Sequence, residues 1–595
     1  MENETLLAEF PPVGAADWQA AIARDLKGAD PDKKLTWRTE EGLAVKPFYR
    51  AEEMERLAGE DLAPGDFTYR RGARATGEWR IREPIHTVDV EQANRLAQAA
   101  LAAGAEGIAF SGVSLESGAA LERLLRNLDT IPVHFDRADE RLIRMLAERL
   151  SKTSHCAGIS AGCDPLKSVE FAAQTIQAAP SGFVPFTIDG GALADAGATA
   201  VEEIAFALAA GVDFLAALDQ RQVEIGRAAS ALEFSFAVGS SYFFEIAKLR
   251  AFRAVWARAV ESFGGSHEAA KARIAARTSQ WNKTLYDPHV NILRATTEAM
   301  AAVLGGADAV TVTAFDACYK TPAETSRRLA RNIQLLLKHE ACLGRVADAG
   351  GGSYAIETIT DFLAQESWKA MQAIEARGGF RQAQADGVMA EALQRSLSAR
   401  EQAVQSRKRV LVGTNQFANP AEQALQRLDE RSIDTAPRGA RAYEQLRLRT
   451  ERHAAAGGKT PRVLLAEIGD AKMRAARSNF AANFFACAGF QITAQRFAKA
   501  DEIAAAEADV IVLCSADPEY AAHAAELMPK LQAPGRETPV IVAGNPENAD
   551  ELRAAGVADF VHLRCQPVEF LTKWQERLGV TDRFPASCSS LEAKS

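Results

Sequence analysis

The chain has 595 residues, of which 47% are hydrophobic and 25% are charged, a balance typical of globular proteins. This length predicts several domain-sized units, and the net charge of -9 argues against nucleic acid or an anionic membrane as a partner, because both attract basic surfaces. The chain has no uninterrupted apolar stretch of spanning length, and its N-terminus lacks the basic start of a signal peptide. We therefore expect a cytoplasmic protein.

Residues 1–70 are predicted to form an extended arm. Apart from a short helix near Ala15–Leu26, this segment has little periodicity, although it contains several aromatic residues. It is too irregular to build a core of its own, so it can gain stability only by lying on another surface. That surface can belong to the same chain or to a partner.

Residues 71–360 show a repeated alternation of strand-like and helix-like segments. Helices are predicted between the strands, for example at Glu91–Ala103 and Ala200–Ala210, where apolar residues recur at helical spacing. Strands are predicted at Gly107–Val113, Ile131–Phe135, Ala157–Ser160, Phe183–Ile188, Leu232–Val238 and Ala309–Phe315, with weaker ones near Ile81–His86, Arg273–Ser279 and Gly344–Ala347. About eight such units predict a (β/α)8 TIM barrel, and an open doubly wound sheet is the alternative.

The remainder of the chain is predicted to hold a second α/β domain. Residues 361–460 are polar, helical and rich in Arg and Gln, which indicates a helical linker. From 461 to 580, five short apolar strands alternate with helices, a pattern typical of a flavodoxin-like domain. Residues 581–595 are expected to form a disordered tail.

Several long segments of the chain resemble methylmalonyl-CoA mutases. They include FSFAVGSSYFFEIAKLRAFRAVW (234–256), RTSQWNKTLYDP (277–288), RVADAGGGSYAIE (345–357) and VLVGTNQF (410–417). The resemblance implies a (β/α)8 substrate barrel joined by a linker to a cobalamin-binding flavodoxin-like domain, the same two architectures that the pattern predicts. It also implies radical isomerisation of an acyl-CoA with adenosylcobalamin, whose cobalt–carbon bond supplies the radical.

The resemblance further implies a histidine that coordinates cobalt, in a D-x-H-x-x-G motif after the first strand of the terminal domain. The matching stretch starts at Glu467, where the family has a lysine, and contains no histidine. Alignment from the strand places Met473 at the ligand position, whereas alignment back from Gly489 places Arg474 there. A thioether is a weak ligand for this purpose and a guanidinium cannot coordinate a metal. We therefore predict that this chain binds no adenosylcobalamin.

Two further positions implied by the resemblance are also altered. The barrel histidine that would stabilise charge on the thioester carbonyl corresponds to Ala275, which donates no hydrogen bond. The tyrosine that would promote homolysis of the cofactor corresponds to a position near Arg74. Loss of all three contacts should lower the rate by more than about 10⁴-fold.

Some members of this family are heterodimers of an active and an inactive subunit with the same two domains, and the chain resembles the inactive, small subunit. This resemblance implies that the chain stabilises a catalytic large subunit, which carries the adenosylcobalamin. Two alternatives stay open on the sequence: a divergent active acyl-CoA mutase, and a stand-alone protein that binds an acyl-CoA or cobalamin.

Overall fold

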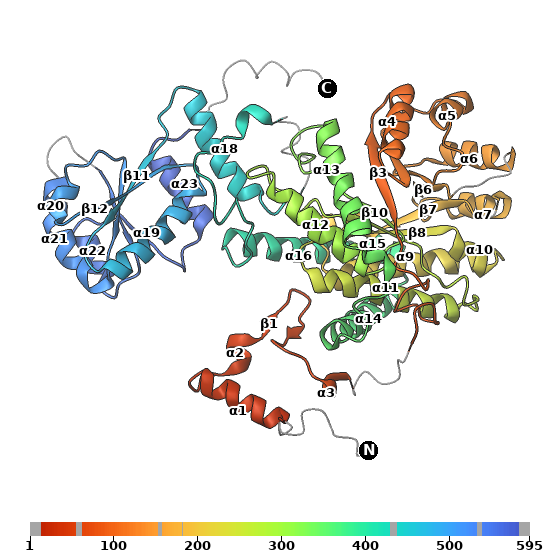
Figure 1. Cartoon of the computed structure of the whole chain (residues 1–595), viewed down its shortest axis with the longest axis horizontal. Helices are drawn as coiled ribbons and strands as arrows, with labels where there is room; N and C mark the ends of the chain where they lie inside the picture. The colour runs from red at the N-terminus through yellow and green to blue at the C-terminus, as the bar shows by residue number, and fades with distance from the viewer. Residues whose placement is uncertain are drawn as a thin grey trace, which may run out of the picture.

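The N-terminal segment forms small elements at one side of the barrel (Figure 1), and Glu40 ties it there through ion pairs with Arg400 and Arg409. The computed structural model describes residues 13–54, 62–152, 158–180, 182–428, 437–531 and 538–581. The segment contains α1 (Ala15–Asp25), α2 (Pro31–Leu35), a hairpin of β1 (Trp37–Arg38) and β2 (Ala44–Val45), and α3 (Ala51–Met54). Helices α1 to α3 bury no residue, in agreement with a segment that lacks its own core.

The middle of the chain forms a closed barrel of eight parallel strands, which confirms the TIM-barrel prediction and excludes the open sheet. The strands are β3 (Arg80–His86), β4 (Gly107–Ser111), β5 (Val133–Phe135), β6 (Ser160–Cys163), β7 (Val184–Asp189), β8 (Leu232–Val238), β9 (Ile274–Thr278) and β10 (Ala309–Thr311). The strand predicted at Ala157–Ser160 begins only at Ser160, and residue 157 lies outside the described residues. The strand predicted at Gly344–Ala347 is wrong, because Leu343–Arg345 form a 3₁₀ turn after Cys342, whose φ of 54° starts a tight turn.

Each barrel strand is followed by at least one helix on the outside of the barrel. The helices are α4 (Val90–Ala102), α5 (Gly118–Leu124), α6 (Glu140–Lys152), α7 (Val169–Ala178), α8 (Gly190–Asp195), α9 (Ala200–Asp219), α10 (Ile225–Ser230), α11 (Tyr242–Ser262), α12 (Val290–Leu304) and α13 (Glu324–Leu335). Helix α14 (Tyr354–Glu375) packs on α9 and α11, so the expected start of the linker at residue 361 falls within a helix of this outer layer. Among the described residues, no helix is long and apolar enough to cross a membrane.

Residues 62–79 close the amino-terminal end of the barrel instead of extending the arm. Tyr69 and Trp79 are buried, and the Trp79 indole N–H donates to Gln334 at 3.2 Å. Arg70 forms a buried ion pair with Glu357 of α14 at 3.0 Å. Residues 62–79 therefore belong to the barrel and not to the predicted arm.

The terminal domain is a parallel five-stranded sheet in the order β12-β11-β13-β14-β15, which confirms the flavodoxin-like prediction. Apolar clusters cover both of its faces. Its strands are β11 (Arg462–Glu467), β12 (Gln491–Arg496), β13 (Val510–Cys514), β14 (Val540–Ala543) and β15 (Asp559–Val561). The helices are α19 (Ala471–Ala486), α20 (Ala500–Ile503), α21 (Tyr520–Leu531), α22 (Ala549–Ala554) and α23 (Pro567–Arg577).

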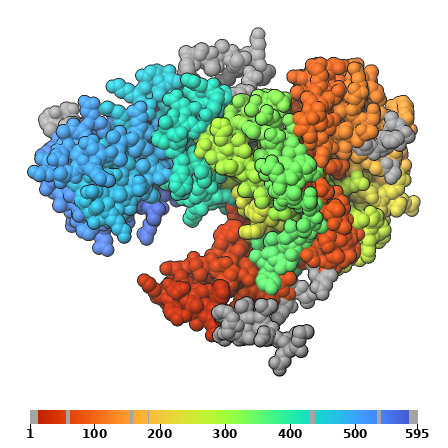
Figure 2. Space-filling model, viewed as in Figure 1, coloured from red at the N-terminus to blue at the C-terminus, as the bar shows by residue number. Residues whose placement is uncertain are grey.

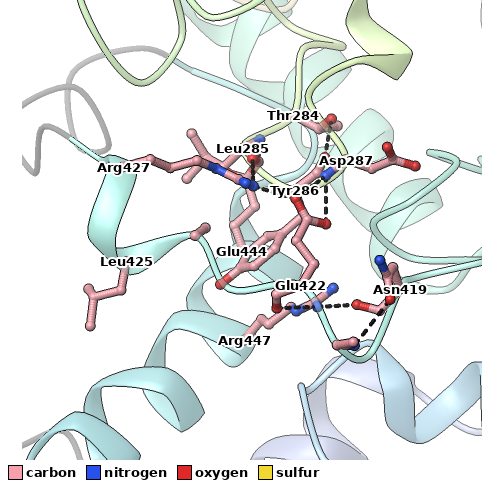
Figure 3. A network of polar contacts seen from close by, with 12 residues as sticks. Thr284, Leu285, Tyr286, Asp287, Asn419, Glu422, Leu425, Arg427, Glu444 and Arg447 are labelled. Carbon is pink, nitrogen blue, oxygen red and sulfur yellow. Dashed lines mark hydrogen bonds and ion pairs between the residues drawn. The ribbon is translucent and has the colours of Figure 1, made fainter.

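A polar network joins the barrel to the segment that precedes the terminal domain (Figure 3). The loop after β9 is held from two sides: Glu444 of α18 (Arg441–Ala455) accepts from the backbone N–H of Leu285 at 2.7 Å, and Glu422 accepts from that of Asp287 at 2.9 Å. Helix α18 in turn packs on α23. Two further helices, α15 (Phe380–Ala385) and α16 (Val388–Gln405), lie in the chain between α14 and α18. The predicted linker is thus a packed helical layer.

Candidate functional site

The barrel encloses a cavity of about 1110 Å³ that reaches the carboxyl-terminal ends of its strands. In TIM barrels this end carries the functional groups, because the loops after the strands meet there. The cavity wall contains charged side chains as well as apolar ones. Its volume is sufficient for a small-molecule ligand.

The floor of the cavity is a buried ion pair across the barrel. Arg82 on β3 donates two hydrogen bonds to Glu233 on β8, each of 3.0 Å. Beside them, the Nδ1 of His134 lies 2.8 Å from the hydroxyl of Ser160 and 3.4 Å from Glu233 Oε1. Burial disfavours the charged carboxylate, but Arg82 outweighs it and lowers the pKa of Glu233 to about 2. Burial, with a contribution from Arg82, lowers the pKa of His134 to about 4, so the imidazole is neutral at pH 7.

The mouth of the cavity carries both acidic and basic groups. Arg277 near the end of β9 donates to Asp195 of α8. Burial raises the pKa of Asp136 to about 6, with a smaller contribution from Asp189 and against the opposing effect of Arg82. The mouth therefore offers hydrogen-bond donors and acceptors to a polar ligand.

The structure places Ala275 in the wall of this cavity. The residue lies on β9 between Ser235 and Ala309 of the neighbouring strands and is 6% exposed. A side chain at this position faces the space that a bound molecule would occupy, and a methyl group donates no hydrogen bond to it. The position implied by the resemblance is thus in the site, but without the group that the chemistry needs.

Arg74 lies at the opposite end of the barrel, among residues that do not line the cavity. Its guanidinium pairs with Asp308, just before β10, at 3.1 Å and donates to the backbone oxygen of Glu78 at 2.8 Å. Tyr69, the nearest phenol in the sequence, is buried and donates to the backbone oxygen of His267 at 2.6 Å. The structure therefore brings Ala275 to the cavity but does not bring Arg74 there.

The remaining predicted positions meet where β11 leads into α19. Asp470 caps the helix, because its carboxylate accepts from the backbone N–H groups of Lys472 at 3.1 Å and Met473 at 2.8 Å. Met473 and Arg474 lie half-buried in the first turn, and Arg474 donates to the backbone oxygen of Gly469 at 3.0 Å.

Glu467, the last of these predicted positions, ends β11 and pairs with Arg496 on the neighbouring strand at 3.3 Å. None of the side chains at these positions, Glu467, Met473 and Arg474, supplies the imidazole that a histidine-ligated cobalamin needs. Within the part of the chain that the structure describes, no cluster of three His, Cys, Asp or Glu side chains could hold a metal ion.

Glu519 lies at the carboxyl edge of the terminal sheet, where it joins the loops that follow β11 and β13. Its carboxylate accepts from the Ser515 hydroxyl at 2.6 Å and from the backbone N–H groups of Asp470 at 3.0 Å and Ala516 at 3.3 Å. The hydrogen bond from Ser515 is the main cause that lowers the pKa of Glu519. Gly469, with φ +76°, passes so close that a Cβ there would collide with this carboxylate.

These loops meet between β11 and β13, the point at which the strand order reverses. Doubly wound sheets bind their ligands in the crevice at such a point. Here Glu519 lies at the crevice, and Ser515, whose hydroxyl donates to it, is completely buried.

Sequence reasoning missed Arg82, His134, Glu233, Asp136 and Glu519. The charged residues within the predicted strand at Ile81–His86 could have indicated a buried ion pair, because a charge that faces a barrel interior needs a partner. The partner Glu233 is 151 positions away, so no local spacing could identify it.

Comparisons with known proteins agree with this architecture. The family model for methylmalonyl-CoA mutase matches residues 38–113 and 164–500. The methylmalonyl-CoA mutase small subunit of Porphyromonas gingivalis is 36% identical and covers 97% of this chain and 99% of the relative. The small subunit of Streptomyces virginiae is 32% identical, with coverage of 97% and 98%.

A large-subunit protein is also similar to this chain. The methylmalonyl-CoA mutase large subunit of Streptomyces virginiae is 28% identical, with coverage of 76% of this chain and 69% of the relative. Among solved structures, Proline Utilization A from Corynebacterium freiburgense aligns with 12% identity and a TM-score of 0.24 over 91% of this chain and 64% of that one, which is too low to support any argument. On the matches of family model and full-length relatives, the chain belongs to the methylmalonyl-CoA mutase family.

Proposed function

We propose that this chain is the non-catalytic small subunit of an adenosylcobalamin-dependent methylmalonyl-CoA mutase and that it stabilises the catalytic large subunit. The complex would interconvert methylmalonyl-CoA and succinyl-CoA, with the adenosylcobalamin held by the large subunit alone. Similarity over nearly the full length to relatives named small subunits supports this assignment.

The observation that carries the proposal is the carboxyl edge of the terminal sheet. A chain that bound cobalamin through a protein ligand would present an imidazole after β11 and leave the crevice open. This chain presents Met473 and Arg474 there, and three hydrogen bonds hold Glu519 at the crevice. Both features oppose binding of the cofactor.

The barrel supports the same proposal independently. Charge that develops on a thioester carbonyl is stabilised by hydrogen-bond donors that are already in position. At the implied position the cavity wall carries the methyl group of Ala275. The neighbouring His134 is neutral and held by Ser160 at the floor, so it is engaged elsewhere.

The open cavity of about 1110 Å³ favours one second candidate, binding of an acyl-CoA without turnover. Titration of the isolated chain with methylmalonyl-CoA in a calorimeter tests it. Saturable one-to-one binding would support this candidate, and heats equal to those of dilution would reject it.

The proposed partner is a large subunit with the same two domains, and the N-terminal segment is expected to contribute to the contact. Val13, just before α1, and Trp18 on α1 are 63% and 48% exposed, and each large apolar side chain that becomes buried contributes about 1.5–3 kcal/mol. Deletion of residues 1–50 should therefore weaken the complex more than it destabilises the isolated chain.

Sedimentation of the mixed subunits, with thermal melts of each chain alone, measures both effects of the deletion. A tight mixed dimer that survives the deletion unchanged would reject the role of the segment. The absence of any mixed dimer with the cognate large subunit would reject the assignment itself.

A further inference from the structure

Six large apolar side chains on and around the loop 409–417 are highly exposed to solvent. They come from the β1 hairpin, the starts of α11 and α12, and the loop itself. They are Trp37 (52% exposed), Phe243 (57%), Leu293 (66%), Val410 (43%), Val412 (44%) and Phe417 (60%), and we call them the apolar patch.

Hydrogen bonds and a ring contact bring together the segments that carry these side chains. The loop is held to the start of α11 by Arg409, which donates to the Ser240 hydroxyl at 3.4 Å. Arg294, next to Leu293, donates to the backbone oxygen of Val412 at 2.8 Å. The ring of Trp37 lies 5.7 Å from that of Phe244, the neighbour of Phe243.

The loop is rigid in spite of its exposed side chains. Asn415 is completely buried, accepts from the backbone N–H of Leu411 at 2.7 Å, and donates to the backbone oxygens of Val404 at 3.0 Å and Arg409 at 2.8 Å. Gly413, with φ +81°, passes so close to Asp287 that a Cβ would collide with it. The patch is therefore preorganised, which lowers the conformational entropy that binding would cost.

The area of the patch indicates that it forms part of an interface. With roughly 150–200 Å² for a fully exposed large side chain, these exposed fractions amount to about 500 Å². This is more than half of the roughly 800 Å² that one partner contributes to a standard interface. Val13 and Trp18, at the start of the N-terminal segment, are also largely exposed and can add to this area. The space-filling view shows the molecule hollowed between the N-terminal segment and the terminal domain (Figure 2).

We infer that the apolar patch docks the large-subunit partner, an inference that rests on the proposed function. Streptomyces virginiae has both a small and a large subunit, and each is similar to this chain. Two chains of one fold tend to pair about a pseudo-twofold axis, in which the same surface of each chain meets that of the other. The partner would therefore present the equivalent surface, with apolar side chains that match the patch.

The test compares charged substitutions inside and outside the patch in the full chain. Phe417→Glu and Leu293→Glu should each weaken the mixed dimer with the cognate large subunit by about 30-fold or more in Kd, measured by sedimentation. Val88→Glu and Leu563→Glu are matched controls, since these side chains are 71% and 88% exposed outside the patch, and should leave Kd unchanged. Thermal melts of each variant exclude unfolding as the cause.

The outcomes separate the patch from the proposed function. A wild-type mixed dimer that the two patch variants retain at full strength would overturn the docking inference alone. A wild-type chain that forms no mixed dimer would overturn both. A wild-type chain that pairs only with itself, and loses this pairing in the patch variants, would overturn the choice of the large subunit as occupant.

Discussion

The barrel and the terminal domain differ in what they offer to a ligand. The barrel encloses a cavity of about 1110 Å³ whose wall carries the methyl group of Ala275, whereas the terminal sheet has Glu519 at the point where doubly wound sheets bind ligands. A missing donor leaves the shape of a site intact, but a side chain held at the binding point must move before a ligand can take its place. The comparison predicts that the barrel holds a ligand more readily than the terminal domain does.

The largest expected effect concerns the barrel floor. Glu233→Ala leaves the buried guanidinium of Arg82 without its carboxylate, which should lower the free energy of unfolding by about 3–5 kcal/mol. The double variant Arg82→Met/Glu233→Leu removes both charges and is the matched control, with most of the stability expected to return. Denaturant unfolding at pH 7 measures both, and equal stability of Glu233→Ala and wild type would contradict this account of the floor.

The carboxylate of Glu233 should also make the free energy of unfolding depend on pH. The pKa of Glu233 is about 2 in the folded chain and about 4.5 ordinarily. A lowered folded-state pKa means that the stabilisation is complete above pH 4.5 and is lost as the pH falls towards 2. The loss should be absent in the double variant, and an identical acid transition in both proteins would be evidence against the ion pair.

A smaller effect is expected at the terminal crevice. Glu519→Ala leaves the Ser515 hydroxyl and two backbone N–H groups without their acceptor, which should cost about 1–2 kcal/mol. Glu519→Gln keeps an acceptor oxygen and is expected to cost less than the alanine variant. Hydrogen exchange at residues 468–473 gives the local readout, and unchanged protection in Glu519→Ala would show that the carboxylate does not hold this loop.

The smallest effect should come from the cavity mouth. Burial raises the pKa of Asp136 from 3.8 to about 6, so its favourable contribution is complete below pH 3.8 and is lost as the pH rises through 6. Its side chain is 42% exposed to the cavity, and solvent screening reduces the expected gain in Asp136→Asn at pH 7 to about 1 kcal/mol. Thermal melts at pH 3.5 and 7 should show a gain only at pH 7, whereas a gain at pH 3.5 alone would reverse the assigned sign.

Periodicity was sufficient to predict the two folds but not the contents of the site. The barrel strands and the terminal sheet follow from short runs such as Leu232–Val238, whose burial is almost continuous. The strand predicted at Gly344–Ala347 was wrong because a run of four residues, Arg345 among them, cannot reveal a turn that starts at Cys342.

Among the site residues, some positions could be inferred from the sequence and some contacts could not. The position of Ala275 in the cavity could be inferred from its strand. The pairing of Arg82 with Glu233 could not, because it depends on closure of the barrel between distant strands. The position of Glu519 at the crevice depends likewise on how two separate loops of the terminal domain meet.

The most direct test of the central claim is a titration of the isolated chain with adenosylcobalamin, followed by visible absorbance. The account predicts no stoichiometric binding, because neither Met473 nor Arg474 supplies an imidazole and hydrogen bonds hold Glu519 at the crevice. Ala275→His should leave both this result and the absence of turnover unchanged, since it restores a donor only in the barrel. A stoichiometric spectrum of histidine-ligated cobalamin from the wild-type chain would contradict the non-catalytic assignment.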